Sequence, residues 1–259
     1  MLSEERKNEI LNELKRTGKV KVIDLARRFQ VSTETIRRDL DILEKKGFLK
    51  RVYGGAIRKS YEAEEPPFIQ RKSVNQETKM KIGKKAAELI SDGDTIVIDV
   101  GTTTLELARA IKNKENITIL TNSLPVAHVL TDALNQHQFT GEVLLLGGIV
   151  NPKQQSISGR LAEKMLEQFH IDKAFISAGG VSLHYGVSDY DLHETLVTQT
   201  MIQVSKETIL LADYSKFGVN SFCKVCPLED LDVIVCDHPL PKEWEHIPQL
   251  KEITWITAE

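Results

Sequence analysis

Residues 32–56 limit the possible folds of the N-terminal region more than any other stretch of the chain. They read STETIRRDLDILEKKGFLKRVYGGA. Three apolar residues recur at spacings of four and three, which predicts a helix with one apolar face: Ile36, Leu40 and Leu43. Ser32 is a suitable N-terminal cap for this helix, and Gly47 is a suitable end. The run therefore predicts a helix that buries one face and exposes the other.

A short basic hairpin is predicted directly after this helix. Residues 48–52 fit a strand, residues 53–55 a turn, and residues 56–57 a returning strand. Lys50 and Arg51 lie on the first of these strands. A hairpin in this place has the form of a wing, and its basic side chains are positioned for the phosphates of a DNA backbone.

Two further helices are predicted before residue 32. Ser3 is a suitable cap for a helix that runs to about residue 16, and Gly18 is a suitable end. Residues 20–22 alternate and fit a very short strand. A second amphipathic helix is indicated by four apolar residues at helical spacing: Val22, Leu25, Ala26 and Phe29. Three helices and a hairpin predict a winged helix-turn-helix domain over residues 1–57.

The polar face of the third helix carries groups that suit DNA recognition. At about 100° per residue, Glu34 and Arg38 lie opposite the apolar stripe, and Thr35 and Arg37 flank it. Arginine reaches guanine O6 and N7 with two hydrogen bonds, or it grips a phosphate. We therefore predict that this helix enters the major groove. The predicted DNA-contacting residues are Ser32, Thr33, Glu34, Thr35, Arg37, Arg38, Lys50, Arg51 and Tyr53.

The charge of the chain is distributed unevenly. Residues 1–60 contain 16 Lys and Arg and 9 Asp and Glu, a net charge of +7. The remaining residues contain 18 basic and 28 acidic side chains, a net charge of −10. This asymmetry favours a polyanionic partner for the N-terminal domain alone. The alternative is a small domain that is solvated by its lysines.

The run at residues 32–56 resembles the winged helix-turn-helix signature of the DeoR family of bacterial transcription regulators. That family often has histidine before the paired glycines, where this chain has Tyr53. The tyrosine hydroxyl can still donate one hydrogen bond to a phosphate. The resemblance implies sequence-specific binding to double-stranded operator DNA. The alternative is a winged helix that binds protein instead of DNA.

An α/β domain is predicted after a linker. Residues 58–75 contain two consecutive prolines and no sustained period, which predicts a connector. From residue 76 to residue 259, apolar runs of strand length alternate with helical patterns. Clear examples of these runs are residues 95–100, 117–120, 173–177 and 208–213. Strands that are apolar on both faces predict a mostly parallel sheet covered by helices, so the fold class is α/β.

Polar residues cluster where the predicted parallel strands end. In such sheets, ligands bind beyond the C-terminal ends of the strands. Residues 101–104 follow one strand and open a helix, whose free N–H groups and three hydroxyls suit an anion. Similar clusters after the other strands predict a pocket for a polyol phosphate. The predicted pocket residues are Asp99, Gly101, Thr102, Thr103, Thr104, Asn122, Ser123, Gly147, Gly148, Asp189, Glu194 and Lys216.

This half of the chain also resembles the DeoR effector domain, which is similar to ribose-5-phosphate isomerase and the CoA-transferase group of folds. The matching pieces are DVGTTT, TNS, LGG, GVSDYDLHE and ADYSKFG. The resemblance implies a repressor of a carbohydrate-metabolism operon that senses a phosphorylated sugar. Carried onto this sequence, it implies that residues 101–104 hold the phosphate. It also implies pocket contacts from Asn122, Ser123, Asp189, Glu194 and Lys216.

The alternative function is a sugar-phosphate isomerase-like enzyme with an appended DNA-binding domain. Carboxylates and a lysine on a related fold could retain proton-transfer chemistry. Similarity of fold does not transfer function, however, and a DNA-binding domain would be idle in a metabolic enzyme. We therefore expect a regulator and no catalytic residues. A DNA-packaging protein is disfavoured, because the acidic large domain would oppose wrapping of DNA.

The remaining expectations concern partners and compartment. One winged helix gives limited specificity, so we expect a homo-oligomer, dimer or tetramer, joined through the large domain. The sequence shows no apolar run of membrane-spanning length and no signal peptide, and its three cysteines cannot all pair, which favours the cytoplasm. Cys223 and Cys226 have the spacing of half a zinc site, but no second pair follows. We therefore expect no metal and no cofactor.

Overall fold

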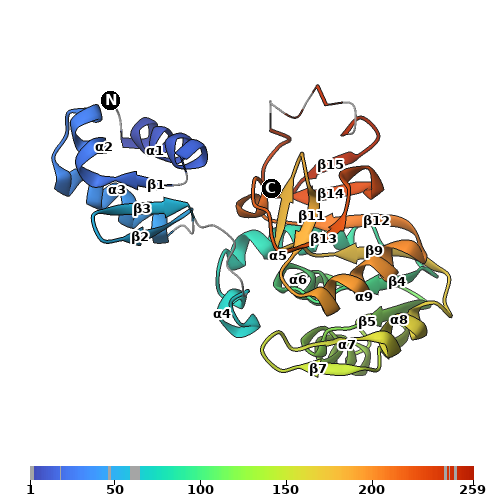
Figure 1. Ribbon diagram of the computed structural model, residues 1–259. Helices are drawn as coiled ribbons and strands as arrows, with labels where there is room; N and C mark the ends of the chain where they lie inside the picture. Colours follow the sequence, from blue (N-terminus) through green and yellow to red (C-terminus); the bar gives the residue numbers. More distant parts are fainter. Residues whose placement is uncertain are drawn as a thin grey trace. The chain divides into compact units, whose positions relative to one another are not determined.

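The computed structural model describes residues 3–17, 19–45, 48–58, 65–241, 244, 246–247 and 250–259. The chain forms two compact units, Met1–Glu62 and Ala63–Glu259, which are coloured blue and cyan to red in Figure 1. Gly18 and Gly47, the predicted ends of two helices, lie outside the described residues.

In the first unit, three helices pack against a small antiparallel sheet. The helices are α1 (Ser3–Thr17), α2 (Val22–Phe29) and α3 (Thr33–Lys45). The strands are β1 (Lys19–Lys21), β2 (Leu49–Val52) and β3 (Gly55–Arg58), in the order β1-β3-β2. The predicted apolar stripes form the core of this unit, with Leu25, Ile36 and Leu40 almost fully buried. The predicted helix-turn-helix with its wing is therefore confirmed as the fold of this unit.

A buried ion pair joins α1 to α3. Arg6 Nε donates a hydrogen bond to Asp39 Oδ2 at 2.6 Å. Only 7% of Arg6 and 3% of Asp39 is exposed to solvent. Ile36 and Leu40 flank Asp39 on the buried side of α3. A buried charge pair therefore helps to position α3, in addition to apolar contacts.

The second unit is built around a parallel sheet. Its seven described strands are, from one edge to the other, β15 (Thr254–Thr257), β14 (Val233–Cys236), β12 (Ser205–Leu211), β9 (Ile171–Ile176), β4 (Thr95–Ile98), β5 (Ile117–Thr121) and β6 (Gly141–Leu145). All hydrogen-bonded neighbours in this sheet run parallel. The predicted α/β fold with a mostly parallel sheet is confirmed.

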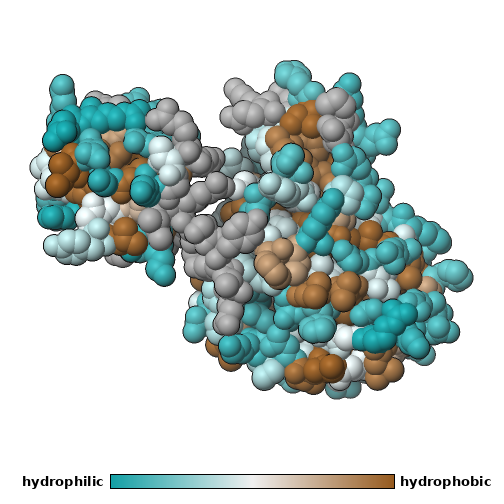
Figure 2. Space-filling model, viewed as in Figure 1, coloured by the Kyte–Doolittle hydropathy of each residue, from teal (hydrophilic) through white to brown (hydrophobic). Residues whose placement is uncertain are grey.

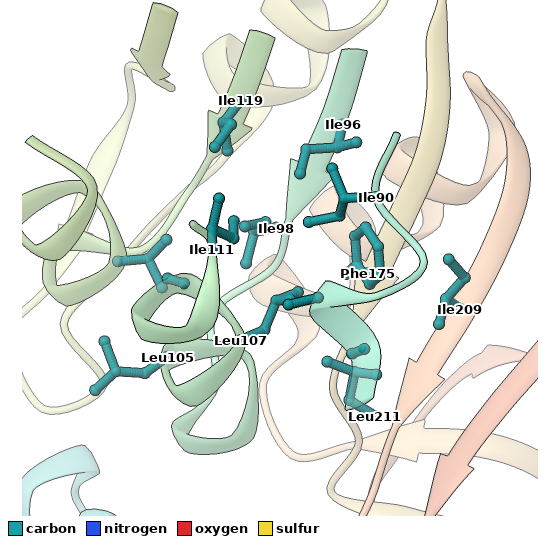
Figure 3. Close-up of a cluster of buried hydrophobic side chains, with 14 of the residues drawn as sticks. Ile90, Ile96, Ile98, Leu105, Leu107, Ile111, Ile119, Phe175, Ile209 and Leu211 are labelled. Atoms are coloured by element: carbon teal, nitrogen blue, oxygen red, sulfur yellow. The ribbon is translucent and has the colours of Figure 1, made fainter. Parts of the chain in front are cut away.

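Helices cover both faces of this sheet. Ile96 and Ile98 of β4 point to one face, where they meet α5 (Gln76–Ala87), α6 (Thr102–Ala110) and α7 (Leu124–Asn135) (Figure 3). Val97 lies between them and points to the opposite face, which α8 (Arg160–Leu166) and α9 (Leu192–Gln203) cover. Because successive side chains of a strand alternate between faces, a fully apolar strand serves both layers.

Two short antiparallel sheets, separate from the parallel sheet, carry further polar residues of the second unit. They are the hairpin of β7 (Ile149–Asn151) and β8 (Ser156–Ser158), and a sheet of β10 (Gly180–Ser182), β11 (Gly186–Asp189) and β13 (Cys223–Cys226). Two 3-10 turns, η1 (Tyr214–Lys216) and η2 (Leu228–Asp230), follow β12 and β13. β7, β8 and β10 have three residues each, which is too short to show a period in the sequence.

Part of the segment predicted as a linker packs into the second unit. Phe68–Lys72 forms the short helix α4, and Phe68 is buried in the same core as Ile82. The Phe68 backbone N–H donates to the Lys153 carbonyl oxygen at 3.0 Å. The structure thus differs from the predicted connector over these residues, because one buried aromatic anchors the segment without setting a period.

The visible surface mixes hydrophilic and hydrophobic residues (Figure 2). Exposed large apolar side chains include Ile149, Leu161 and Phe222. None of the helices in the described ranges is both long and apolar enough to cross a membrane.

Candidate DNA-binding surface and effector pocket

The exposed face of α3 presents the predicted recognition residues. Ser32 caps the helix, because its Oγ accepts a hydrogen bond from the Thr35 N–H at 3.1 Å. Arg37 and Arg38 both lie on the exposed face, and Arg37 Nη1 is 3.4 Å from Glu34 Oε2. The cap orders the first turn of the helix, so that the exposed side chains beyond it project from a fixed backbone.

The wing presents two of its three predicted residues to solvent. Tyr53 at the tip is fully exposed, and Lys50 is exposed on β2. Arg51 instead forms an ion pair with Asp41 of α3, and its backbone N–H donates to Glu44 Oε1 at 2.6 Å. Arg51 therefore fastens the wing to α3, in addition to any role at a DNA backbone.

In the second unit, polar side chains meet beyond the ends of β4 and β5. Asp99 follows β4 and is buried, and Asn122 follows β5 and is fully buried. Asn122 Nδ2 donates to Asp99 Oδ1 at 3.1 Å, and Thr198 Oγ1 of α9 donates to Asp99 Oδ2 at 2.9 Å. Asn122 Oδ1 is buried without a hydrogen-bond partner among the described residues. The strand ends thus hold a carboxylate in place and leave one acceptor free.

A pocket of about 260 Å³ opens beside this cluster. Its lining includes Glu194 at the start of α9, whose carboxylate accepts hydrogen bonds from Ser156 Oγ and from Asn151 Nδ2, the latter at 3.3 Å. Both donors come from the β7–β8 hairpin. The other lining residues are Glu65, Asn151, Lys153, Gln154, Tyr190 and Asp191.

Basic side chains lie close to these carboxylates. Arg71 of α4 forms an ion pair with Glu65, with Nη1 2.7 Å from Oε1. Lys79 of α5 is buried, and its Nζ donates to the Arg71 carbonyl oxygen at 2.8 Å. Lys216 in η1 is half-buried, and its charge acts on Glu65, Lys79 and Asp189. The region therefore combines these three cations and the lining residue Lys153 with several carboxylates.

Burial dominates the electrostatics of this region. It raises the pKa of Glu194 to about 8 and the pKa of Asp99 to about 7. It also raises the pKa of Glu65 to about 7, although Arg71, Lys216 and Lys79 oppose this rise. The pKa of Lys79 falls to about 8 for the same reason, burial of a charged group. Charges here are poorly solvated, so a ligand that supplies hydrogen bonds or charge would stabilise them.

Two family models match the chain. The DeoR-like helix-turn-helix domain matches residues 6–62, and the DeoR C terminal sensor domain matches residues 74–238. The second match alone covers more than half of the chain. The chain belongs to the DeoR family. The first match contains α3 and the wing, and the second contains the strand ends described above, so both halves of the resemblance predicted from the sequence are confirmed.

Relatives match over nearly the whole length of this DeoR-family chain. It is 32% identical over 241 residues to the glycerol-3-phosphate regulon repressor of Escherichia coli (strain K12), with 93% of each chain covered. It is 35% identical over 229 residues to the HTH-type transcriptional regulator IolR of Bacillus subtilis (strain 168), with 88% of each covered. The chain is thus a DNA-binding transcriptional regulator, and the alternative of an enzyme is set aside.

Solved structures also match part of the chain. Ribose 5-phosphate isomerase A from Methanocaldococcus jannaschii covers 55% of this chain and 55% of its own, at 18% identity and a TM-score of 0.39. A similarity this low says nothing about activity.

The polar cluster at the strand ends brings together only some of the residues predicted from the sequence. Hydrogen bonds and charge interactions connect Asp99, Asn122, Asp189, Glu194 and Lys216. Gly101 begins α6, and a Cβ there would lie 2.7 Å from Ser177 Cβ, so this turn admits only glycine without a shift. The following residues are buried at the helix start: Thr102, Thr103 and Thr104.

Within the described residues, three predicted residues show no side-chain contact to the pocket carboxylates, although Ser123 forms an isolated β-bridge with Ser156. Ser123 caps α7, because its Oγ accepts a hydrogen bond from the Val126 N–H at 3.4 Å. Gly147 and Gly148 follow the edge strand β6 and lie near Leu161 and Ser158. No contact found among the described residues joins these two glycines to the pocket, so a role for them stays a prediction.

Sequence reasoning missed several residues of the region, and one of them left a readable signal. Lys79 recurs with Ile82 and Ala86 on the buried stripe of α5, where a charged residue is unusual. Asn151 and Ser156 lie on a short hairpin, and their partner Glu194 is 43 and 38 residues away. Such long-range pairs leave no pattern in a single sequence.

Glu194 gives the second unit a specific pH dependence. The unfolded chain releases this proton near pH 4.5, whereas native Glu194 keeps it until about pH 8. Between these values the native state binds more protons, so the free energy of unfolding falls as pH rises through this window and is unaffected by Glu194 below it. We expect Glu194→Gln to reduce this fall by on the order of a few kcal/mol.

Urea unfolding at about pH 5 and about pH 8 measures this difference. Glu229→Gln is a matched control, because Glu229 is exposed. Equal pH dependence in the wild type and both variants would contradict the buried, protonated state of Glu194.

Proposed function

We propose that this DeoR-family regulator represses a carbohydrate-metabolism operon and that a phosphorylated sugar modulates its binding to operator DNA. The observation that carries the proposal is that cationic side chains and carboxyl groups lie together at one end of the parallel sheet. Arg71, Lys79 and Lys216 supply cations, and Asp99 and Glu194 supply carboxyl groups. Cations suit a phosphate, and carboxyl groups suit sugar hydroxyls.

The remaining acceptor in this region supports a polyol as the ligand. Asn122 Oδ1 is buried and has no hydrogen-bond partner among the described residues. A sugar hydroxyl can donate to this oxygen and accept from a second group at the same time. One relative is named for glycerol 3-phosphate, which is itself a phosphorylated polyol. An effector of this class would satisfy both the free acceptor and the cations.

The DNA-binding part of the proposal rests on α3 and the wing. Exposed side chains from α3 would read bases in the major groove, and Lys50 and Tyr53 would contact the backbone. We further propose a homo-oligomer, dimer or tetramer, that reads repeated half-sites through several winged helices in the cytoplasm. The effector changes operator affinity only if it binds one arrangement of the oligomer more tightly than another.

A thermal-shift screen of the full chain tests the effector class. We expect one phosphorylated sugar to raise the melting temperature and its unphosphorylated parent to leave it unchanged, because only the ester engages the cations. At about 100 times Kd the stabilisation is about 2.7 kcal/mol. The same ester should change operator affinity in a mobility-shift assay. If the melting temperature of this protein rose equally with both sugars, or with neither, a pocket that recognises phosphate would be contradicted.

A further inference from the structure

We propose that Glu65 is a built-in competitor of the effector phosphate: its carboxylate pairs with Arg71 and neutralises the cations beside the pocket until an incoming anion displaces it. The inference rests on the proposed function, because it assigns to Glu65 the regulation of that same pocket. Glu65 lies outside the residues that the sequence singled out, in the segment predicted as a linker.

Glu65 reaches the pocket as a fixed and nearly buried side chain. It lines the pocket together with Asp191 and Glu194. Its side chain is 8% exposed, and that of its partner Arg71 is 16% exposed. The 2.7 Å contact between Arg71 Nη1 and Glu65 Oε1 is thus shielded from water and from salt. The anionic group beside the pocket cations is therefore supplied by the chain itself.

The backbone around Glu65 is fastened to the pocket wall. Gln154 Nε2 donates to the Glu65 carbonyl oxygen at 3.2 Å, and Arg71 Nη2 donates to Gln154 Oε1 at 2.7 Å. Arg71 Nε also donates to the Pro66 carbonyl oxygen at 3.0 Å. Arg71 therefore holds both the Glu65 carboxylate and the chain next to it. If Arg71 turned toward a ligand, both contacts would weaken together.

The charged form of Glu65 is not strongly stabilised in this position. Burial and the nearby charge of Asp189 raise the pKa of Glu65 to about 7 against the opposing charges of Arg71, Lys216 and Lys79. Attraction by three cations therefore does not fully offset the loss of hydration and the repulsion by Asp189. A buried carboxylate with this balance is a ligand that a stronger anion can replace.

A phosphate ester is such a stronger anion. It carries a charge of about −1.5 to −2 at neutral pH and three acceptor oxygens. It would meet the same cations that act on Glu65, and the charge of Asp189 already opposes a second anion there. Removal of the Glu65 carboxylate as the phosphate arrives keeps the local charge nearly balanced. Displacement is therefore favoured over a state in which both anions share the site.

The position of Glu65 along the chain connects the pocket to the first unit. Residues 59–64 alone separate it from β3, the last strand of the wing. Displacement of Glu65 would move the point at which the chain enters the second unit. An anion in the pocket would thus act on the segment that leads to the DNA-binding unit.

The test compares full-length wild type with Glu65→Gln, using inorganic phosphate as the probe. Glutamine keeps the shape and can still accept a hydrogen bond from Arg71, but it lacks the charge. At about pH 8, one unit above the Glu65 pKa of about 7, this carboxylate is ionised in about nine-tenths of molecules. If it then occupies the cations, the variant should bind phosphate about tenfold more tightly by titration calorimetry. Glu77→Gln removes the same charge from an exposed position of α5 and should bind like wild type.

Hydrogen exchange of peptides that span residues 65–72 is the second measurement. We expect phosphate to increase exchange there in wild type, and Glu65→Gln to show raised exchange without phosphate. If phosphate binds both proteins equally, or binds the variant more weakly, or lowers exchange in this segment, the competitor role is overturned and the proposed effector class still stands. If neither phosphate nor any sugar phosphate binds either protein, the proposed effector class fails, and this inference fails with it.

Discussion

Arg6→Ala is expected to destabilise the DNA-binding unit by about 3–5 kcal/mol, which is comparable to the whole stability of a small domain. The substitution leaves the Asp39 carboxylate in the interior without the guanidinium that lies 2.6 Å from it. Because Asp39 lies on the buried side of α3, loss of the pair should release the recognition helix from α1. Operator binding should be lost together with the fold of this unit.

The two tryptophans allow unfolding of the first unit to be distinguished from unfolding of the second. Trp244 and Trp255 both belong to the second unit, so tryptophan fluorescence follows that unit alone. Circular dichroism follows the helices of both units. In Arg6→Ala we expect part of the helical circular dichroism signal to be lost at low urea concentration. The urea midpoint of the fluorescence transition should equal that of wild type.

Arg28→Ala is the matched control for the buried pair. Arg28 lies 3.3 Å from Glu9 and also contacts Glu13, but its side chain is about half exposed. Exposed pairs contribute about 0.2–1 kcal/mol, so this variant should unfold almost like wild type. A second variant, Arg6→Met with Asp39→Leu, should recover much of the lost stability, because it removes both charges of this pair. Equal effects of Arg6→Ala and Arg28→Ala would contradict a stabilising buried pair.

The fold could be predicted from the sequence wherever an element was long enough to show a period. Ile36, Leu40 and Leu43 repeat along α3, and the fully apolar strands identify a sheet that is covered on both faces. Some short elements, such as α4 and the β7–β8 hairpin, left no such pattern. Phe68 shows the reason: one buried aromatic anchors α4 in the core, and a single residue has no period.

The pocket was predictable where it depends on strand ends and not where it depends on long-range pairs. Asp99 and Asn122 follow neighbouring parallel strands, so their proximity follows from the topology. Gly147 follows a strand of the same sheet, but β6 lies at its edge. Glu65 and Lys79 were not predicted as residues of the pocket region. Whether a charged side chain is buried depends on packing between distant segments, which a linear pattern does not specify.

Arg38→Ala is expected to weaken binding to the operator by about 1–3 kcal/mol, which is about five- to 150-fold in Kd. Arg38 is exposed on α3, and no hydrogen bond or ion pair within the described part of the chain engages it. Arg37 already interacts with Glu34, so Arg38 is the sharper test of the recognition helix. The DNA would be a site that wild type selects from a random-sequence library, with Kd measured by fluorescence anisotropy.

The pattern of loss in Arg38→Ala identifies the kind of contact. If Arg38 reads a base, binding to the selected site weakens far more than binding to random DNA, and preference at one position is relaxed. If it contacts a phosphate, binding to all sequences weakens alike, and the slope of log affinity against log salt falls by about one. Arg160→Ala, an equal loss of charge on the second unit, should change neither quantity. Unchanged affinity in both Arg37→Ala and Arg38→Ala would remove α3 from the role of recognition helix, because that role depends on these two exposed arginines.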